Sequence, residues 1–288
     1  MKKFVFISDY FINNGIGGAE LTTDAIMRAG IKRNLEIGGF HCVKLDRRTL
    51  EQDNNKDKYH FIVCNFFQLR DDVKLYMAKN CSYTIVEYDY KICKHRSFEL
   101  HQLIEGKPCD CEEQMHGKIN SVFYGYAEKV WFMSEKQKAL ILEKVSTLKE
   151  ENCQVLNSVF NQGDLNFMSS IKNNEKNNKY LILESDSPVK PSEIGIKYAE
   201  ENNLEYELVS GLPYHELLIK MSVSKGLIFL PRASDTCPRF VMEAKMLGCD
   251  LILNEHVQHK DEPWFDTQES CYKHLNNRTD IFWEYYEQ

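Results

Sequence analysis

The stretch of sequence that decides the fold is residues 226–254, GLIFLPRASDTCPRFVMEAKMLGCDLILN. Residues 226–231 form an apolar run of strand length, and a polar loop follows it. Residues 240–247 then place apolar side chains at helical spacing, and Gly248 ends this segment. A second apolar run at 250–254 completes a strand–helix–strand unit, which predicts two parallel strands joined by a helix.

The same alternation of strands and helices extends over the rest of the chain. Before residue 160, the apolar runs that predict strands are 4–8, 40–45, 61–66, 82–86, 129–133 and 154–157. After a polar, asparagine-rich stretch that is typical of a linker, two more runs follow at 180–184 and 206–210. We therefore predict an α/β protein with two Rossmann-like parallel-sheet domains, at 1–160 and 179–263, a linker at 161–178, and a helical tail at 264–288 that packs back on the first domain.

The composition limits the class of protein. A chain of 288 residues is long enough for two domains, and its formal charge of −7 provides no general attraction for nucleic acid or anionic lipid. No apolar run is long enough to cross a bilayer, and the run at the start is too short for a secretory signal. We therefore predict a cytoplasmic protein without a membrane anchor, whose ten cysteines are reduced thiols.

A glycine-rich turn follows the first predicted strand and runs into a helical segment. Glycines at such a turn allow a close approach of the backbone to a ligand, and the helix start offers N–H groups to an anion. Gly15, Gly17 and Gly18 do not have the spacing of a dinucleotide-binding fingerprint, and no Gly-Lys-Ser/Thr of a P-loop follows. The turn therefore argues against a nicotinamide enzyme and against a P-loop kinase.

The loop and helix of residues 230–249 carry a more specific pattern. Asp235 is followed by seven residues, then by Glu243-Ala244, and Gly248 stands one turn later. This pattern resembles the signature of the retaining GT-B glycosyltransferases (glycosyl transferases group 1). The resemblance implies a GT-B fold with a cleft between the two domains, Glu243 on the ribose of the donor, and Asp235 near the transferred sugar. It also places the backbone N–H groups of Thr236 and Cys237 near that sugar.

Other segments resemble the same family. The turn Gly17-Gly18-Ala19-Glu20 resembles the N-terminal loop that faces the donor diphosphate and the acceptor, and Asp89 follows a strand where relatives often carry a His-Asp pair. The family places an Arg and a Lys against the donor phosphates, and Lys190 matches that Lys. No matching Arg follows residue 184, so Arg232 or Arg239 is the candidate substitute. Cations there would stabilise the departing diphosphate.

Two alternatives about metals stay open. No Asp-x-Asp pair of metal-dependent transferases is present, so we predict no obligatory metal and no cofactor other than the nucleotide sugar as co-substrate. Soft and borderline ligands are nevertheless concentrated between residues 93 and 116, and their spacings match no zinc template. This stretch is either a zinc site or a loop with incidental thiols; its residues are Cys93, His95, His101, Cys109, Cys111 and His116.

The resemblance implies a function. The expected reaction is transfer of a sugar from a UDP- or GDP-sugar to an acceptor hydroxyl with retention of configuration. Asp89 and Asp235 are the catalytic candidates, and the donor-binding candidates are Gly17, Gly18, Lys190, Thr236, Cys237, Arg239 and Glu243. The alternatives are a nucleotide-sugar epimerase, a sugar-nucleotide-binding protein without turnover, and a phage-type DNA-base glycosyltransferase. The acceptor (a glycan, a small molecule or a modified DNA base) and the oligomeric state stay open.

Overall fold

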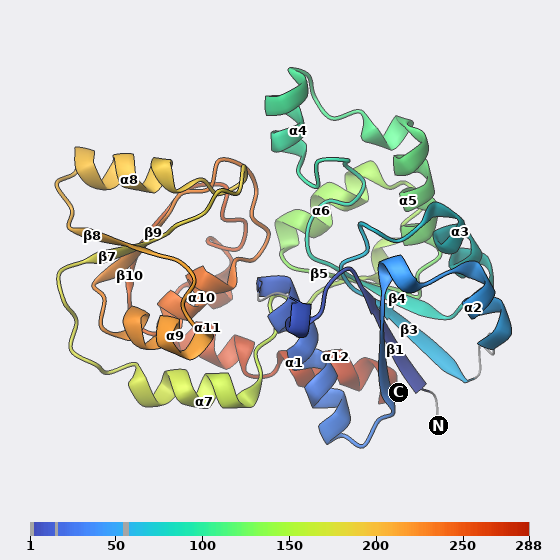
Figure 1. Cartoon of the computed structure of the whole chain (residues 1–288), viewed down its shortest axis with the longest axis horizontal. Helices are drawn as coiled ribbons and strands as arrows, with labels where there is room; N and C mark the ends of the chain where they lie inside the picture. Colours follow the sequence, from blue (N-terminus) through green and yellow to red (C-terminus); the bar gives the residue numbers. More distant parts are fainter. Residues whose placement is uncertain (1–2, 15–16, 54–57, 288) are drawn as a thin grey trace. The chain divides into compact units, whose positions relative to one another are not determined.

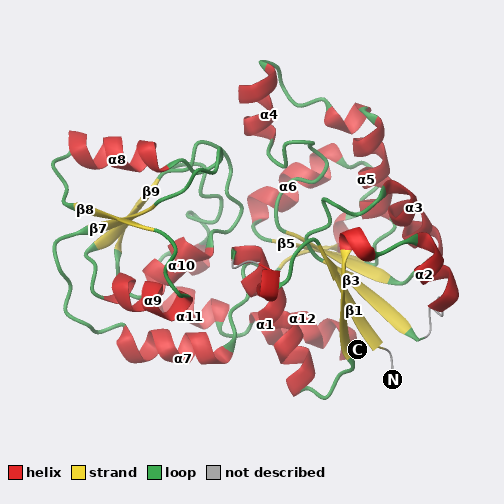
Figure 2. Ribbon diagram, viewed as in Figure 1, coloured by secondary structure: helices red, strands yellow, loops and turns green. Residues whose placement is uncertain are grey.

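The computed structural model describes residues 3–14, 17–53 and 58–287. The chain forms two compact units, each built on a parallel β-sheet with helices (Figures 1 and 2). Unit 1 comprises Met1–Val159 together with Arg278–Gln288, and unit 2 comprises Phe160–Asn277. Within the described residues, no helix is both long and apolar enough to span a membrane.

Unit 1 contains a six-stranded parallel sheet with the order β2-β1-β3-β4-β5-β6. The chain starts in the interior of the sheet at β1, adds β2 on one side, and then continues on the other side. This reversal is the switch point at which α/β sheets bind ligands beyond the carboxyl ends of their strands. The strands are β1 (Lys3–Ser8), β2 (Ile37–His41), β3 (Tyr59–Val63), β4 (Tyr83–Glu87), β5 (Lys129–Phe132) and β6 (Cys153–Val155).

The predicted strand at 40–45 is wrong in position. The structure has β2 at Ile37–His41, and residues Cys42–Lys44 form a short 3-10 helix. β2 is an edge strand whose residues are only partly buried or exposed, so it lacks the apolar run that identifies the inner strands. Its position is set by pairing with β1, where Val5 lies opposite Gly38, a contact that local sequence does not reveal.

The helices of unit 1 pack around this sheet. The C-terminal helix α12 belongs here although it follows all of unit 2: the fully buried indole of Trp283 donates a hydrogen bond to the carbonyl of Ile26, 2.9 Å away. Gly30 leaves room for that indole, because a Cβ at this position would lie 2.5 Å from it. The helices are α1 (Gly18–Lys32), α2 (Arg47–Asp53), α3 (Asp71–Asn80), α4 (Phe98–Glu105), α5 (Met115–Gly125), α6 (Glu135–Lys144) and α12 (Arg278–Glu287).

Unit 2 contains a four-stranded parallel sheet with the order β10-β9-β7-β8. Its core includes Ile182 of β7, Ile228 of β9 and Ala199 of α8. The strands are β7 (Tyr180–Leu183), β8 (Tyr206–Val209), β9 (Gly226–Phe229) and β10 (Asp250–Leu253), and the helices are α7 (Gln162–Ile171), α8 (Ser192–Glu201), α9 (Tyr214–Ser222), α10 (Arg239–Met246) and α11 (Gln268–Leu275).

Two predicted domain boundaries need correction. The predicted linker at 161–178 contains helix α7, which starts where the side chain of Asn161 accepts a hydrogen bond from the backbone N–H of Asp164. Leu165 and Met168 of α7 are buried, so the polar composition of this stretch hid a helix with one apolar face. The predicted tail at 264–288 is also divided, because α11 belongs to unit 2 and only α12 returns to unit 1.

Candidate functional site

The loops that follow β7 and β9 meet at the carboxyl edge of the sheet in unit 2. The backbone N–H of Arg232 donates to the carbonyl of Val189, 2.7 Å away. Further along the same loop, the N–H of Asp235 donates to the carbonyl of His256 at 2.9 Å, and the N–H of Gln258 donates to the carbonyl of Asp235 at 3.1 Å. These backbone bonds hold Asp235 at the edge where parallel sheets bind their ligands.

Lys190 and Asp235 form an ion pair across these loops. The Nζ of Lys190 lies 3.3 Å from Oδ2 of Asp235, and the two side chains are 38% and 15% exposed. The loop then passes through the buried residues Thr236 and Cys237 into helix α10, which begins at Arg239. The partial positive charge of a helix start and the accessible ammonium of Lys190 are both suited to an anionic ligand. The structure therefore brings two of the predicted site residues into contact.

Glu243 and Arg239 form a second pair, one turn apart on α10. Nε of Arg239 lies 3.4 Å from Oε1 of Glu243, and the guanidinium lies over the ring of Phe160 with its carbon 3.7 Å from the ring centroid. Glu243 is only 2% exposed. Burial raises the pKa of its carboxyl, and the nearby Arg239 opposes this rise. In this structure Arg239 and Glu243 therefore pair with each other in the interior of unit 2.

Tyr214 is a member of this group that sequence reasoning missed. It is the first residue of α9, and its hydroxyl donates to Oε1 of Glu243 at 2.8 Å. Nη2 of Arg239 in turn donates to the oxygen of Tyr214 at 3.2 Å. The only local signal is a tyrosine directly after Pro213 at a helix start, which is too common to indicate a site. The hydroxyl of Tyr214 thus already occupies Oε1 of Glu243 as a hydrogen-bond donor.

A second polar group lies in unit 1, at the carboxyl end of β4. The Nζ of Lys91 donates to Oε1 of Glu87 at 2.7 Å and to Oδ1 of Asp89 at 3.0 Å. Nε of Arg96 donates to the other carboxylate oxygen of Asp89 at 2.7 Å. The hydroxyl of Tyr124 donates to the second oxygen of Glu87. Asp89, predicted to be catalytic, thus has a cation on each of its oxygens.

The two carboxyl groups of this network differ in their ionisation. Burial raises the pKa of Glu87 to about 7, although Lys91 opposes the rise. Burial also acts on Asp89, but Lys91 and Arg96 outweigh it and lower the pKa of that carboxyl. Asp89 is therefore a weak proton acceptor, and its geometry is that of a residue which holds the loop after β4 in place.

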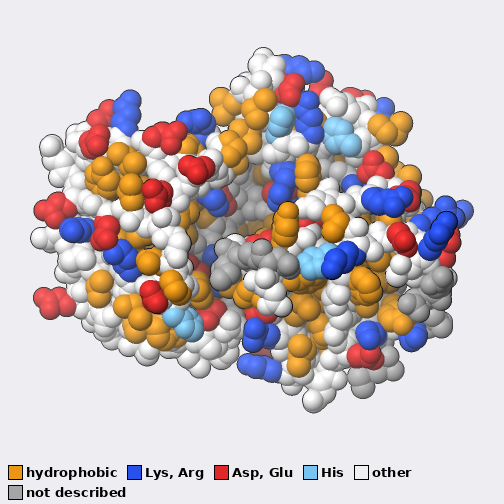
Figure 3. Space-filling model, in the orientation of Figure 1, with side chains coloured by type: hydrophobic (Ala, Val, Ile, Leu, Met, Phe, Trp, Pro, Cys, Tyr) orange, Lys and Arg blue, Asp and Glu red, His pale blue; other side chains and the backbone are white. Residues whose placement is uncertain are grey.

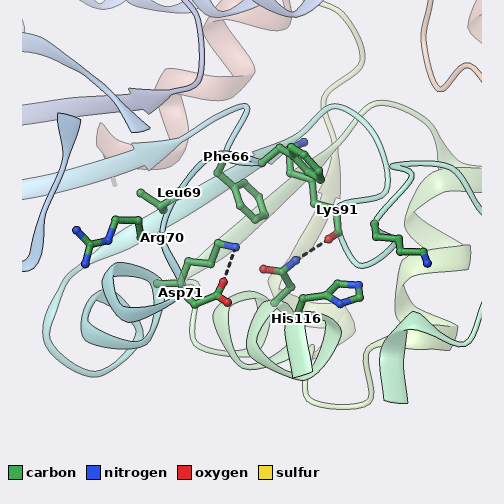
Figure 4. Close-up of a pocket in the computed structure, with 10 residues that line it drawn as sticks. Phe66, Leu69, Arg70, Asp71, Lys91 and His116 are labelled. Carbon is green, nitrogen blue, oxygen red and sulfur yellow. Dashed lines mark hydrogen bonds and ion pairs between the residues drawn. The ribbon is translucent and has the colours of Figure 1, made fainter. Parts of the chain in front are cut away.

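A cavity of about 380 Å³ lies beside this network (Figure 4). It is formed by the loops after β3 and β4 together with the starts of α3 and α5. The Nζ of Lys74 donates a hydrogen bond to Oδ1 of Asp71, 3.2 Å away. The lining combines aromatic and basic side chains; its residues are Phe66, Phe67, Leu69, Arg70, Asp71, Lys74, Lys91, Lys94, His116 and Asn120.

Asp9, at the carboxyl end of β1, holds one side of this cavity and was not singled out from the sequence. Its buried carboxylate accepts hydrogen bonds from the backbone N–H groups of Phe67 and Gln68, each at 2.9 Å. The signal that could have found it is an acidic residue directly after the first strand, where a parallel sheet faces its ligands. Asp9 thereby fixes the position of Phe67 on the cavity wall.

The glycine-rich turn is only partly described. Gly17 precedes α1 in an extended conformation, and Gly18 is the first residue of that helix. A Cβ on Gly17 would lie 2.5 Å from a carboxylate oxygen of Glu20, the far end of a flexible side chain. Gly15 and Ile16 lie outside the described residues. The predicted donor contact of this turn therefore stays a prediction.

No family model matches the chain, and no curated protein matches its sequence. Among solved structures, it is similar to AviGT4, a glycosyltransferase involved in avilamycin A biosynthesis, with a TM-score of 0.57 and 8% identity over 100% of this chain and 97% of that one. It is also similar to Alr3699/HepE of Anabaena in complex with UDP and glucose, with a TM-score of 0.55 and 10% identity over 98% and 94% of the two chains.

A third similar structure is an alpha-glucosyltransferase in complex with UDP and a 13-mer DNA that contains an HMU base. Its TM-score is 0.52, with 9% identity over 99% of this chain and 92% of that one. Each of the three matches spans both units. At such low identity the similarity concerns the fold and not the substrates.

Proposed function

The chain has the GT-B fold, as its sequence predicts, and on this premise we propose that it is a glycosyltransferase which takes a sugar from a nucleoside diphosphate sugar. HepE was solved with UDP and glucose, and the alpha-glucosyltransferase was solved with UDP, so UDP-sugar is the donor that we propose. In the reaction the acceptor oxygen bonds to the anomeric carbon, the bond from that carbon to UDP breaks, and the acceptor proton passes to the departing phosphate. We propose retention of configuration, as in the family that the sequence resembles.

The observation that carries the proposal is the pair of Lys190 and Asp235 at the carboxyl edge of the sheet in unit 2. The departing diphosphate gains negative charge in the transition state, and a cation already held in position stabilises that charge. Lys190 is such a cation, because its ammonium lies 3.3 Å from Asp235 at this edge until a phosphate replaces the carboxylate, and more than a third of the side chain stays accessible. Asp235 itself, with the backbone of Thr236 and Cys237, is proposed to face the transferred sugar.

The ribose of the donor is proposed to bind at Glu243. Its Oε1 accepts a hydrogen bond from the hydroxyl of Tyr214. A ribose hydroxyl is chemically equivalent to that donor, so binding would exchange one hydroxyl for another and leave the number of hydrogen bonds unchanged. Arg239, which faces Phe160 and Glu243, would then hold the carboxylate rather than contact the phosphates.

The acceptor is proposed to bind in the cavity of unit 1. Phe66 and Phe67 offer an apolar face, while Arg70 and Lys94 are the more accessible cations of the lining. This combination favours an acceptor with an apolar or aromatic face and an anionic group. On the face that Figure 3 shows, acidic and basic side chains are interspersed over both units, a pattern suited to a small acceptor rather than to a long polyanion.

Turnover of UDP-glucose, UDP-galactose and UDP-N-acetylglucosamine by the full chain tests the proposal. Release of UDP would be measured with small phenolic and sugar acceptors and with single- and double-stranded DNA that contains hydroxymethylated bases. NMR of the product gives the anomeric configuration. Acceptor-dependent UDP release supports the proposal, and the productive acceptor identifies its class. Saturable UDP binding without turnover indicates a sugar-nucleotide-binding protein, and conversion of the donor sugar without acceptor indicates an epimerase; either result rejects the transferase.

A further inference from the structure

The segment between β4 and α5 has little apolar core of its own. It spans residues 88–114 and contains α4 and a short 3-10 helix, Cys111–Glu113. In Figure 1 it extends away from the sheet of unit 1, with α4 at its far end. Leu103 and Ile104 of α4 are 59% and 56% exposed, so α4 buries few of its apolar side chains. Small segments of this kind usually need a cross-link or a metal to hold one conformation.

Four potential metal ligands of this segment converge on one point. We infer that Cys93, His101, Cys109 and Cys111 form a structural zinc site. Their ligand atoms, three sulfurs and one imidazole nitrogen, all lie within 4.8 Å of one another. Nδ1 of His101 lies 3.6 Å from Sγ of Cys93 and 3.5 Å from Sγ of Cys111.

The two S···N distances are those expected for a tetrahedron around zinc. With Zn–S bonds of about 2.3 Å and a Zn–N bond of about 2.0 Å, tetrahedral angles place a sulfur and a nitrogen ligand about 3.5 Å apart and two sulfurs about 3.8 Å apart. The two measured S···N separations, 3.5 and 3.6 Å, match this value. Three cysteines and one histidine are also a common ligand set of structural zinc.

The surroundings of the ligands fit a metal as well. The buried Nε2 of His101 lies 4.0 Å from Oδ1 of Asp110 and has no hydrogen-bond partner among the residues described. Zinc on Nδ1 would leave the proton on Nε2, directed at that carboxylate, and such an outer carboxylate orients a ligating imidazole. The backbone N–H of His95 donates to Sγ of Cys93 at 3.4 Å, an outer contact that holds this sulfur in place.

The spacing of the ligands explains why the sequence alone leaves both a zinc site and a loop with incidental thiols open. Seven residues separate Cys93 from His101, seven separate His101 from Cys109, and one separates Cys109 from Cys111, which matches no zinc motif. The fold brings them together from four places: Cys93 lies in the loop before α4, and His101 lies in α4. Cys109 lies in the loop after α4, and Cys111 starts the 3-10 helix. The other two candidates have other partners: the ring of His95 pairs with Glu105 and lies edge-on to the ring of His101, and His116 lines the cavity.

The site would fix one wall of the cavity in unit 1. Lys94, which lines the cavity, directly follows Cys93, and Lys91 lies two residues before it. On the other side, α5 packs tightly on the site, because a Cβ on Gly117 would lie 1.9 Å from the carbonyl oxygen of Cys111. Zinc would therefore hold the segment 88–114 in the conformation in which its basic residues face the cavity.

Metal analysis of the full chain tests this inference independently of sugar transfer. Protein purified under reducing conditions with zinc present should hold one equivalent of zinc by mass spectrometry, and X-ray absorption should report three sulfur ligands and one nitrogen. Removal of zinc by a chelator should lower Tm, and added zinc should restore it. Asp110→Asn should weaken zinc binding by about 10- to 100-fold while the four ligands remain.

The ligand variants complete the test. Cys109→Ser should lose zinc, whereas Cys109→His should keep zinc with two sulfurs and two nitrogens. Cys153→Ser is the matched control, because Cys153 is another buried thiol of unit 1 outside the cluster. If the ligand variants fail to fold, the zinc content and the X-ray absorption spectrum of the wild-type protein still decide whether the four residues bind zinc. Protein without zinc, a Tm that is insensitive to the chelator, a disulfide among the three cysteines, or full zinc content in a folded Cys109→Ser variant would overturn the inference.

Discussion

Replacement of Lys190 by alanine separates phosphate recognition from nucleoside recognition. A hydrogen bond between an ammonium and a phosphate contributes about 1.5–3 kcal/mol, so Lys190→Ala should raise the Kd for UDP by about 10- to 150-fold. Uridine lacks the diphosphate, and its Kd should change by less than about twofold. Lys197→Ala is the matched control, since Lys197 of α8 is an exposed lysine of unit 2 that also pairs with a carboxylate, at 3.8 Å.

Replacement of Asp235, the partner of Lys190, should have the opposite effect on the affinity for UDP. Asp235 competes with the phosphate for the ammonium, and an ion pair of such exposure contributes only about 0.2–1 kcal/mol. Asp235→Asn should therefore tighten UDP binding by up to about fivefold, even where it abolishes transfer. Isothermal titration calorimetry measures the Kd of UDP, UMP and uridine for the wild type and for the variants Lys190→Ala, Lys197→Ala and Asp235→Asn. Equal weakening of UDP and uridine in Lys190→Ala, or weakening of UDP in Asp235→Asn, would refute the assignment of Lys190 to the phosphates.

Three further predictions follow from the two polar groups. Lys91→Met leaves the buried Glu87 and the partly buried Asp89 without their shared cation, so it should lower the free energy of unfolding by about 3–5 kcal/mol in urea titrations. A loss below about 1 kcal/mol would contradict this. The folded pKa of Glu87, about 7, exceeds its ordinary 4.5, so the free energy of unfolding should fall as the pH rises through this window. Glu87→Gln should flatten this pH dependence, and an unchanged slope between pH 5 and 8 would exclude Glu87 as its source. Tyr214→Phe removes the hydroxyl that donates to Oε1 of Glu243, so calorimetry should show tighter UDP binding. The free energy of unfolding should fall by about 1.5–3 kcal/mol. Weaker UDP binding would contradict the proposed exchange of the tyrosine hydroxyl for a ribose hydroxyl.

Local sequence was sufficient for most of the fold because its inner strands are fully buried. The runs at 180–184 and 226–231 correspond to the inner strands β7 and β9, since strands covered on both faces read as continuous apolar stretches. The run at 250–254 corresponds to β10, an edge strand that is apolar in sequence although its residues are partly buried or exposed. The edge strand β2 carries no such signal, and its position depends on pairing with β1. Helix α7 was missed because its buried side chains are few and its flanks are polar.

The candidate site was less predictable because its contacts join distant parts of the chain. The sequence identified Lys190 and Asp235 separately, and their pairing depends on backbone bonds between the loops after β7 and β9. Tyr214 reaches Glu243 from another helix, which no spacing rule reveals. The same reason applies to the cysteine–histidine cluster, whose ligands are individually ordinary and acquire a metal-binding geometry only in the folded chain.

The most direct test of a UDP-sugar transferase is the thermal unfolding of the purified chain with UDP, GDP, ADP and NAD. A ligand that binds only the folded state at about 100 times its Kd adds about 2.7 kcal/mol of stability. We predict such an increase in Tm with UDP, and a stabilisation of about half that size or less in Lys190→Ala at the same UDP concentration. Absence of any shift with the three nucleoside diphosphates, or a shift with NAD alone, would contradict the proposed function.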